Sequence, residues 1–173
     1  MPTKIPARMA FLGHTARMAF GPYDRRRAFA FHEAGHAVVG HVCGSRVTSV
    51  SVGEHGTTDI TWSESDSDGE MKCLWAGITA EQTYEKNCEP PASDTDSWSG
   101  WVVDDAEING ICDRRLDDDA SKISELRLSM LDGARKVLAM NWKFVEKLAS
   151  MLEDKTVISG DNLIQFFCEI KSP

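Results

Sequence analysis

The residues best suited to chemistry in this chain form the pentapeptide HEAGH, which runs from His32 to His36. Its two histidines are four positions apart, so on a helix both imidazoles project from one face and can bind one metal ion. Zinc held by neutral imidazoles lowers the pKa of a bound water toward about 7. The carboxylate of Glu33 can take a proton from that water and deliver it to a leaving amine. The pattern predicts metal-assisted peptide hydrolysis with Glu33 as the general base.

The motif leaves a catalytic zinc one protein ligand short, because such sites have three. His41 lies five positions after His36 and therefore falls off the ligand face. The remaining histidines, His14 and His55, are more simply interpreted as surface side chains. We therefore expect the third ligand to be a carboxylate further along the chain.

The elements that position these residues follow from the hydrophobic pattern. Apolar residues at helical spacing predict a helix over 25–43 that contains the motif. Gly35 inside it indicates either close approach of another backbone or a need for space. Two short strands are predicted within 46–62, around a turn at 54–56. The other expected elements are an acidic loop over 63–70, a helix over 71–85, a loop over 86–103, a helix from about Asp104, one long or two shorter helices over 114–153, and a last helix over 162–169.

Composition bounds the function classes. The chain has 173 residues and a formal net charge of −8, which argues against nucleic-acid binding because phosphate contacts need clustered Lys and Arg. It contains no apolar run long enough to cross a membrane. The five cysteines form no CxxC pair and indicate reduced thiols, so we expect a cytoplasmic protein. Residues 1–23 contain Lys and Arg but no acid, so they are predicted to be an arm, and organelle targeting through them stays open.

Several segments together resemble one known family. RRRAFAFHEAGHAVVG, over 25–40, resembles the start of the peptidase domain of the FtsH family, the AAA+ zinc proteases. VTSVSV over 47–52, LWAGITAEQ over 74–82 and the segment 134–163 resemble later parts of that domain. The resemblance covers roughly 25–170 and implies a zinc domain over 24–173. The implied fold is mostly α (α+β), with the zinc helix beside a small β-sheet and with a C-terminal helical hairpin.

The resemblance also implies an Asp as the third zinc ligand, after a Gly-containing loop at the start of a helix. Keeping the family's Ser-Gly spacing puts that ligand on Asp104, and Asp105 is the alternative. The helix register favours Asp104, because the positions four, seven and eight residues later are then all apolar. Asp94 and Asp96 are weaker candidates, since they lie in the looser part of the loop.

The chain departs from the family in two respects. It contains no nucleotide-binding P-loop, and AGITAEQ stands where the family has GGRAAEE. We therefore expect a zinc endopeptidase that cleaves unfolded or extended polypeptides without an ATPase of its own. Two further expectations are that a separate ATPase delivers the substrate and that the chain forms a homo-oligomer. Its substrate would add a strand to the edge of the small sheet. The alternative is a zinc-stabilised binding or adaptor domain, with the loop 97–101 covering the site.

Overall fold

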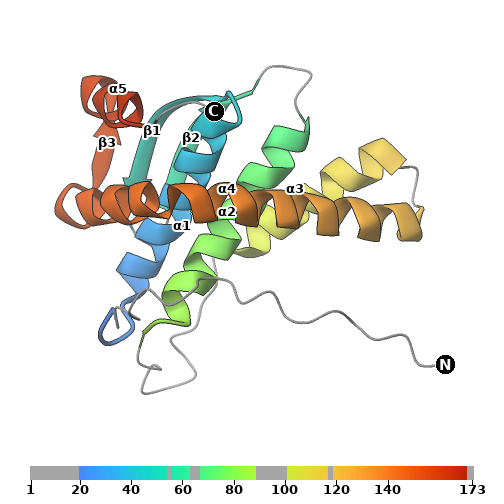
Figure 1. Ribbon diagram of the computed structural model, residues 1–173, viewed down its shortest axis with the longest axis horizontal. Coiled ribbons are helices and arrows are strands. Elements are labelled where there is room, and N and C mark those ends of the chain that lie inside the picture. Colours follow the sequence, from blue (N-terminus) through green and yellow to red (C-terminus); the bar gives the residue numbers. More distant parts are fainter. Residues whose placement is uncertain (1–19, 54–55, 63–66, 89–100, 117–118, 171–173) are drawn as a thin grey trace.

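The computed structural model describes residues 20–53, 56–62, 67–88, 101–116 and 119–170 (Figure 1). These residues form a mostly helical α+β fold, as predicted. The helices are α1 (Arg25–Val42), α2 (Ser67–Glu85), α3 (Trp101–Leu116), α4 (Ala120–Asp154) and α5 (Gly160–Cys168). The strands are β1 (Arg46–Val52), β2 (Gly56–Thr61) and β3 (Val157–Ser159).

The helix α1 lies at the centre of the fold and carries the HEAGH motif. The side chain of Asp24 caps its N-terminus by accepting a hydrogen bond from the backbone N–H of Arg27 at 3.1 Å. The chain turns away after Val42 through Gly44, whose φ of +90° suits glycine. Every residue from Ala28 to Gly40 is buried, because α2, α4 and the sheet all pack against this helix.

The sheet is small and antiparallel, with strand order β2-β1-β3. Val50 of β1 pairs with Thr58 of β2 on one side and with Ile158 of β3 on the other. Val50 and Val52 are fully buried toward the helices. Among the described residues, β2 is therefore an edge strand that pairs only with β1.

The apolar side chains gather in two clusters. The central core joins α1, the sheet, α5 and the C-terminal half of α4, and the smaller lateral core joins α2, α3 and the N-terminal half of α4. The lateral core consists of Met71, Leu74, Ile78, Ile108, Ile111, Cys112 and Met130. The helix α2 faces both clusters, because Ala76, Ala80 and Tyr84 belong to the central core.

The structure corrects three predicted boundaries. α2 begins at Ser67, inside the segment predicted as an acidic loop, because Asp68 and Glu70 in its first turn interact favourably with the helix dipole. α3 begins at Trp101, earlier than Asp104, so residues 101–103 of the predicted loop are helical. The last helix begins at Gly160, two residues before its predicted start.

The C-terminal part of the chain is built around one long helix. α4 continues without a break through Gly133, so the alternative of a break there is wrong. The predicted start at 114 is also wrong, because 114–116 belong to α3 and α4 begins at Ala120. α3 and α4 contact each other and run in opposite directions, so they form a helical hairpin (Figure 1). The resemblance matched the hairpin and the short helix after it to 134–163, but that segment contains the later part of α4, then β3 and the start of α5, so this placement is wrong. The strand β3 was not predicted, because its three residues are too few for an alternating pattern.

Two further expectations concern cysteines and membranes. All five cysteines lie among the described residues, and all are free thiols, as predicted. None of the described helices combines the length and the apolar character needed to cross a bilayer.

Candidate metal centre

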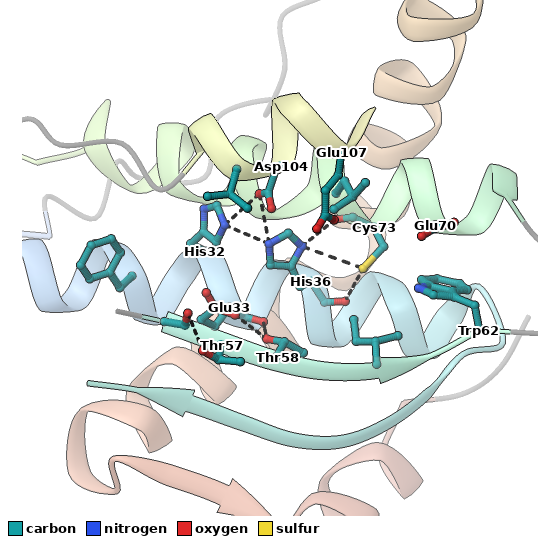
Figure 2. Close-up of a pocket in the computed structure, with 15 residues that line it drawn as sticks. His32, Glu33, His36, Thr57, Thr58, Trp62, Glu70, Cys73, Asp104 and Glu107 are labelled. Atoms are coloured by element: carbon teal, nitrogen blue, oxygen red, sulfur yellow. Dashed lines mark hydrogen bonds and ion pairs between the residues drawn. The ribbon is translucent and has the colours of Figure 1, made fainter. Parts of the chain in front are cut away.

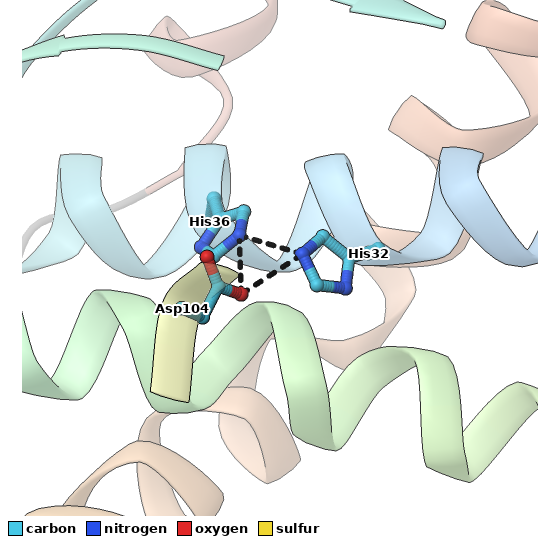
Figure 3. Close-up of side chains that lie close together, drawn as sticks. All are labelled: His32, His36 and Asp104. Carbon is cyan, nitrogen blue, oxygen red and sulfur yellow. Dashed lines mark hydrogen bonds and ion pairs between the residues drawn. The ribbon is translucent and has the colours of Figure 1, made fainter. Parts of the chain in front are cut away.

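Three side chains predicted as ligands lie together between α1 and α3 (Figure 3). The Nε2 atoms of His32 and His36 are 2.9 Å apart. The Oδ2 atom of Asp104 lies 3.0 Å from Nε2 of His32 and 3.2 Å from Nε2 of His36. All three residues are buried, with at most 8% of their surface exposed. These atoms form a compact triangle, which is how three ligands of one tetrahedral ion are arranged.

The outer nitrogen of each imidazole is held by a partner behind it. Nδ1 of His32 lies 2.8 Å from Oε2 of the buried Glu81 on α2. Nδ1 of His36 lies 2.9 Å from the backbone carbonyl oxygen of Cys73. Both partners are acceptors, so both neutral rings carry their proton on Nδ1 and turn an Nε2 lone pair toward Asp104.

This arrangement calls for positive charge between the three ligand atoms. Oδ2 of Asp104 is buried and accepts no hydrogen bond, although both imidazoles are close to it. Two Nε2 lone pairs and a carboxylate oxygen repel one another unless protons or a cation separate them. Two imidazoles and one carboxylate are a donor set that fits zinc. The described residues therefore fit the ion that the sequence predicts.

The pKa values of the three groups also indicate that positive charge is favoured between them. Burial and the neighbouring His36 act to lower the pKa of His32, but its contacts with Asp104 and Glu81 outweigh both and raise it. Burial likewise acts to lower the pKa of His36, yet the carboxylate of Asp104 raises it well above its usual value. Burial acts to raise the pKa of Asp104, but the two imidazoles hold it far below its usual range.

Glycines let the helices approach closely enough to form the site. A Cβ atom on Gly35 would lie 2.6 Å from the carbonyl oxygen of Ala76, so the close approach predicted at Gly35 is confirmed. A Cβ atom on Gly77 would collide with the ring of His36 and would lie 2.9 Å from Nε2 of His32. Only glycine at position 77 leaves the two Nε2 atoms accessible from the side of α2.

Glu33 faces the strand β2 rather than α2. Its carboxylate oxygen Oε2 accepts a hydrogen bond from the hydroxyl of Thr58 at 2.6 Å. The residue is 5% exposed, so its carboxylate is largely shielded from bulk water. The predicted base is therefore held at the side of the motif that faces the sheet (Figure 2).

One cleft of about 580 Å³ contains the three ligands and Glu33. Figure 2 shows His32 and His36 projecting from α1 toward Asp104 and Glu107 on α3, with β2 along the other side. Among the described residues that line the cleft, the charged side chains other than histidine are all acidic. Its full lining is Phe29, His32, Glu33, His36, Gly56, Thr57, Thr58, Ile60, Trp62, Glu70, Cys73, Leu74, Val103, Asp104 and Glu107.

The other candidate ligands lie elsewhere. His41 stacks on Phe167 with ring centroids 4.3 Å apart, away from the ligand triangle. The carboxylate of Asp105, the alternative to Asp104, forms an ion pair with Arg127 on α4. His14, His55, Asp94, Asp96 and the loop residues 97–100 lie outside the described residues.

Sequence reasoning missed the residues that hold the ligands and the base. Glu81 had a detectable signal, because it is a carboxylate on the face of α2 that also carries Leu74 and Ile78. Thr58 and Gly77 had none, since each acts through a contact with a distant segment.

Neither a family model nor a curated protein matches this chain. The resemblance to the FtsH peptidase domain therefore depends on the motifs in the sequence.

Proposed function

We propose that this protein is a zinc-dependent endopeptidase that hydrolyses unfolded or extended polypeptides. The observation that carries the proposal is the convergence of His32, His36 and Asp104 within 2.9–3.2 Å, in the same cleft as Glu33. Histidines alone at this spacing would suit many roles. Together with a buried third ligand and an acidic neighbour, they fit metal-assisted hydrolysis.

The zinc ion and the side chains of the protein would contribute different parts of the chemistry. When bound, zinc supplies Lewis acidity, which polarises a carbonyl and makes water more acidic. Glu33 accepts a proton from the attacking water and passes it to the nitrogen of the leaving amine. Glu81 and the carbonyl of Cys73 keep the imidazoles in the tautomer that binds metal.

The edge of the sheet supports a polypeptide as the substrate. The side of β2 not paired with β1 has no partner strand among the described residues. Gly56, Thr57, Thr58 and Ile60 of this strand line the cleft. An extended peptide can hydrogen-bond to such an edge through its own backbone, with little dependence on its sequence. Most backbone groups of a folded protein are already hydrogen-bonded within it, so the preferred substrate would be unfolded or extended.

Metal content and casein cleavage, measured together, test the proposal. We expect about one zinc per chain and cleavage that a chelator abolishes. Glu33→Gln should retain zinc and lose cleavage by at least about 100-fold, because the amide cannot accept the proton. Glu125→Gln is the matched control, since Glu125 is exposed on α4 and outside the cleft.

Two outcomes would contradict the endopeptidase. A chain that binds no zinc would remove the metal centre itself. Bound zinc without cleavage of any unfolded protein would favour the zinc-stabilised binding or adaptor domain. Delivery of substrate by a separate ATPase and assembly into a homo-oligomer stay predictions from the resemblance.

A further inference from the structure

The face of β2 that points toward α1 runs alongside the HEAGH motif. Gly56, Thr58 and Ile60 alternate with the more exposed Thr57 and Asp59 along the strand. The inward residues therefore share the side that faces α1. A Cβ atom on Gly40 of α1 would lie 3.2 Å from Ile60, so the inner face of β2 follows α1 beyond the motif.

Two of these inward positions meet the carboxylate of Glu33. The hydroxyl of Thr58 lies 2.6 Å from Oε2 of Glu33 and 3.2 Å from the backbone carbonyl oxygen of the same residue. A hydroxyl has one proton to donate, and the shorter contact to the charged acceptor is the stronger of the two. Thr58 therefore holds one oxygen of the carboxylate in place.

Gly56 shapes the other side of the same carboxylate. A Cβ atom at this position would collide with Oε1 of Glu33 and would lie 2.6 Å from its Cγ atom. Any larger residue would push the side chain of Glu33 out of its present position. The carboxylate thus occupies a space that Gly56 leaves open and Thr58 closes with a hydrogen bond.

We infer that Thr58 is a positioning residue for Glu33, and that Gly56 provides the space in which Thr58 holds it. The inference rests on the proposed function, in which Glu33 is the base. A base that shifts by about 1 Å from its working position can lose a large part of its effect. Because β2 is also the strand to which substrate is proposed to add, one element both receives the peptide and holds the base.

Three variants test this role through kcat and KM for a casein-derived peptide. Thr58→Val keeps the shape of the side chain and removes the donor, so kcat should fall about 10-fold to 100-fold with KM nearly unchanged. Thr58→Ser restores the hydroxyl and should recover most of kcat. Thr156→Val is the matched control, because Thr156 is exposed, lies outside β2 and does not line the cleft. Zinc content should equal that of the wild type in all three.

A wild-type kcat in Thr58→Val would overturn the inference and leave the proposed function intact. Equal losses in Thr58→Val and Thr58→Ser would also overturn it, because the hydroxyl would then not be the cause. If the wild type itself fails to cleave, the proposed function fails and the catalytic role of Thr58 fails with it.

The contact between Thr58 and Glu33 has a readout that does not need activity. Urea unfolding of the zinc-free protein would be compared for Thr58→Val, Glu33→Ala and the double variant. Thr58→Val should lower the unfolding midpoint more in the presence of Glu33 than in the Glu33→Ala background, since only the former leaves a buried carboxylate without its donor. Equal shifts in both backgrounds would show that the hydrogen bond does not form.

Discussion

The two hydrophobic cores contribute differently to the candidate site. The central core surrounds α1 and holds it from three sides, through α2, α4 and the sheet. It contains large aromatic side chains in mutual contact, with Phe31 stacked against Tyr84 at 4.9 Å between ring centroids. His32, Glu33 and His36 all belong to this well-supported helix.

The lateral core supports α3, which carries one of the three ligands, Asp104. Its buried side chains are fewer, and ion pairs at its surface add to them, between Arg127 and Asp105 and between Arg115 and Asp68. Such pairs, one exposed and one half-buried, contribute little free energy. α3 is therefore the less firmly held of the two helices that meet at the site.

Because the two helices at the site belong to different cores, a bound ion would also affect the tertiary structure. The ligand triangle joins a helix of the central core to a helix of the lateral core, so an ion bound there links the two. A site whose ligands come from separately packed elements binds metal and completes the tertiary structure in one step. The predictions that follow test how unequal the two regions are.

The largest expected effect on zinc affinity comes from a substitution in α2, the helix that contacts both cores. Gly77→Ala would place a methyl group against the rings of both His32 and His36. We expect zinc affinity to fall by more than about 100-fold, since even partners outside the ligand set alter it 10-fold to 100-fold. Metal titration would measure the loss.

Gly110→Ala is the control for this change, in a helix of the lateral core. The atom nearest to a Cβ there is Nη1 of Arg114 at 3.5 Å, which is an ordinary contact. Zinc affinity should stay at the wild-type value, and stability should rise by up to about 1 kcal/mol from helix propensity. Wild-type zinc affinity in Gly77→Ala would show that the helices can separate without loss of the site.

Adjacent acids on α3 provide the next comparison. Asp104→Asn removes the charge of a proposed ligand, so zinc affinity should fall by about 100-fold or more. Asp105→Asn removes the ion pair with Arg127 and weakens the hydrogen bond from Asn109, so the free energy of unfolding should change by about 1 kcal/mol and zinc affinity should not change. Similar losses of zinc affinity in the two variants would contradict the assignment of the third ligand.

The sequence predicted those parts of the site that depend on one helix at a time. The histidine spacing places both rings on one face of α1, and the register of α3 distinguishes Asp104 from Asp105. Ile108, Ile111 and Cys112 are all buried, as that register requires. Periodicity reports on which side of a helix faces the core. It was sufficient for the two histidines, whereas Asp104 also depended on the Ser-Gly spacing of the FtsH resemblance.

The parts that could not be predicted depend on contacts between distant segments. Thr58 is 25 positions from Glu33, and a single threonine in a polar strand gives no sign of its partner. Gly77 matters because of two side chains on another helix. The early start of α2 was missed for a different reason, since acidic residues are typical both of loops and of the first turn of a helix.

Removal of the metal should affect the two regions unequally. Hydrogen exchange would be followed with zinc bound and after treatment with a chelator. We expect exchange in the first turns of α3 to accelerate by more than about 10-fold, while α1 between Ala28 and Gly40 stays protected by the central core. Equal acceleration in both helices would mean that the ion supports the whole fold, and no change in either would mean that it does not link the cores.

The smallest expected effect is a dependence of zinc stabilisation on pH. Without metal, the raised pKa of His36 reflects a favourable contact between its imidazolium and the carboxylate of Asp104. That contact stabilises the fold fully below the unfolded-state pKa of histidine, about 6.5, and is lost as pH rises through the raised value. The lowered pKa of Asp104 acts at the other end, so its contribution is lost only in strong acid.

Zinc requires neutral imidazoles, so protons compete with it most below the raised pKa of His36. The increase in Tm on addition of zinc should therefore be larger at about pH 8 than at about pH 6, since the metal-free protein loses its ion pair as the metal gains affinity. Thermal unfolding with and without zinc would measure it. Asp104→Asn should remove most of the increase at both pH values, because it lacks the group on which both the ion pair and the ion depend. An increase that is equal at the two pH values in the wild type would mean that the protonated histidines do not compete with the metal.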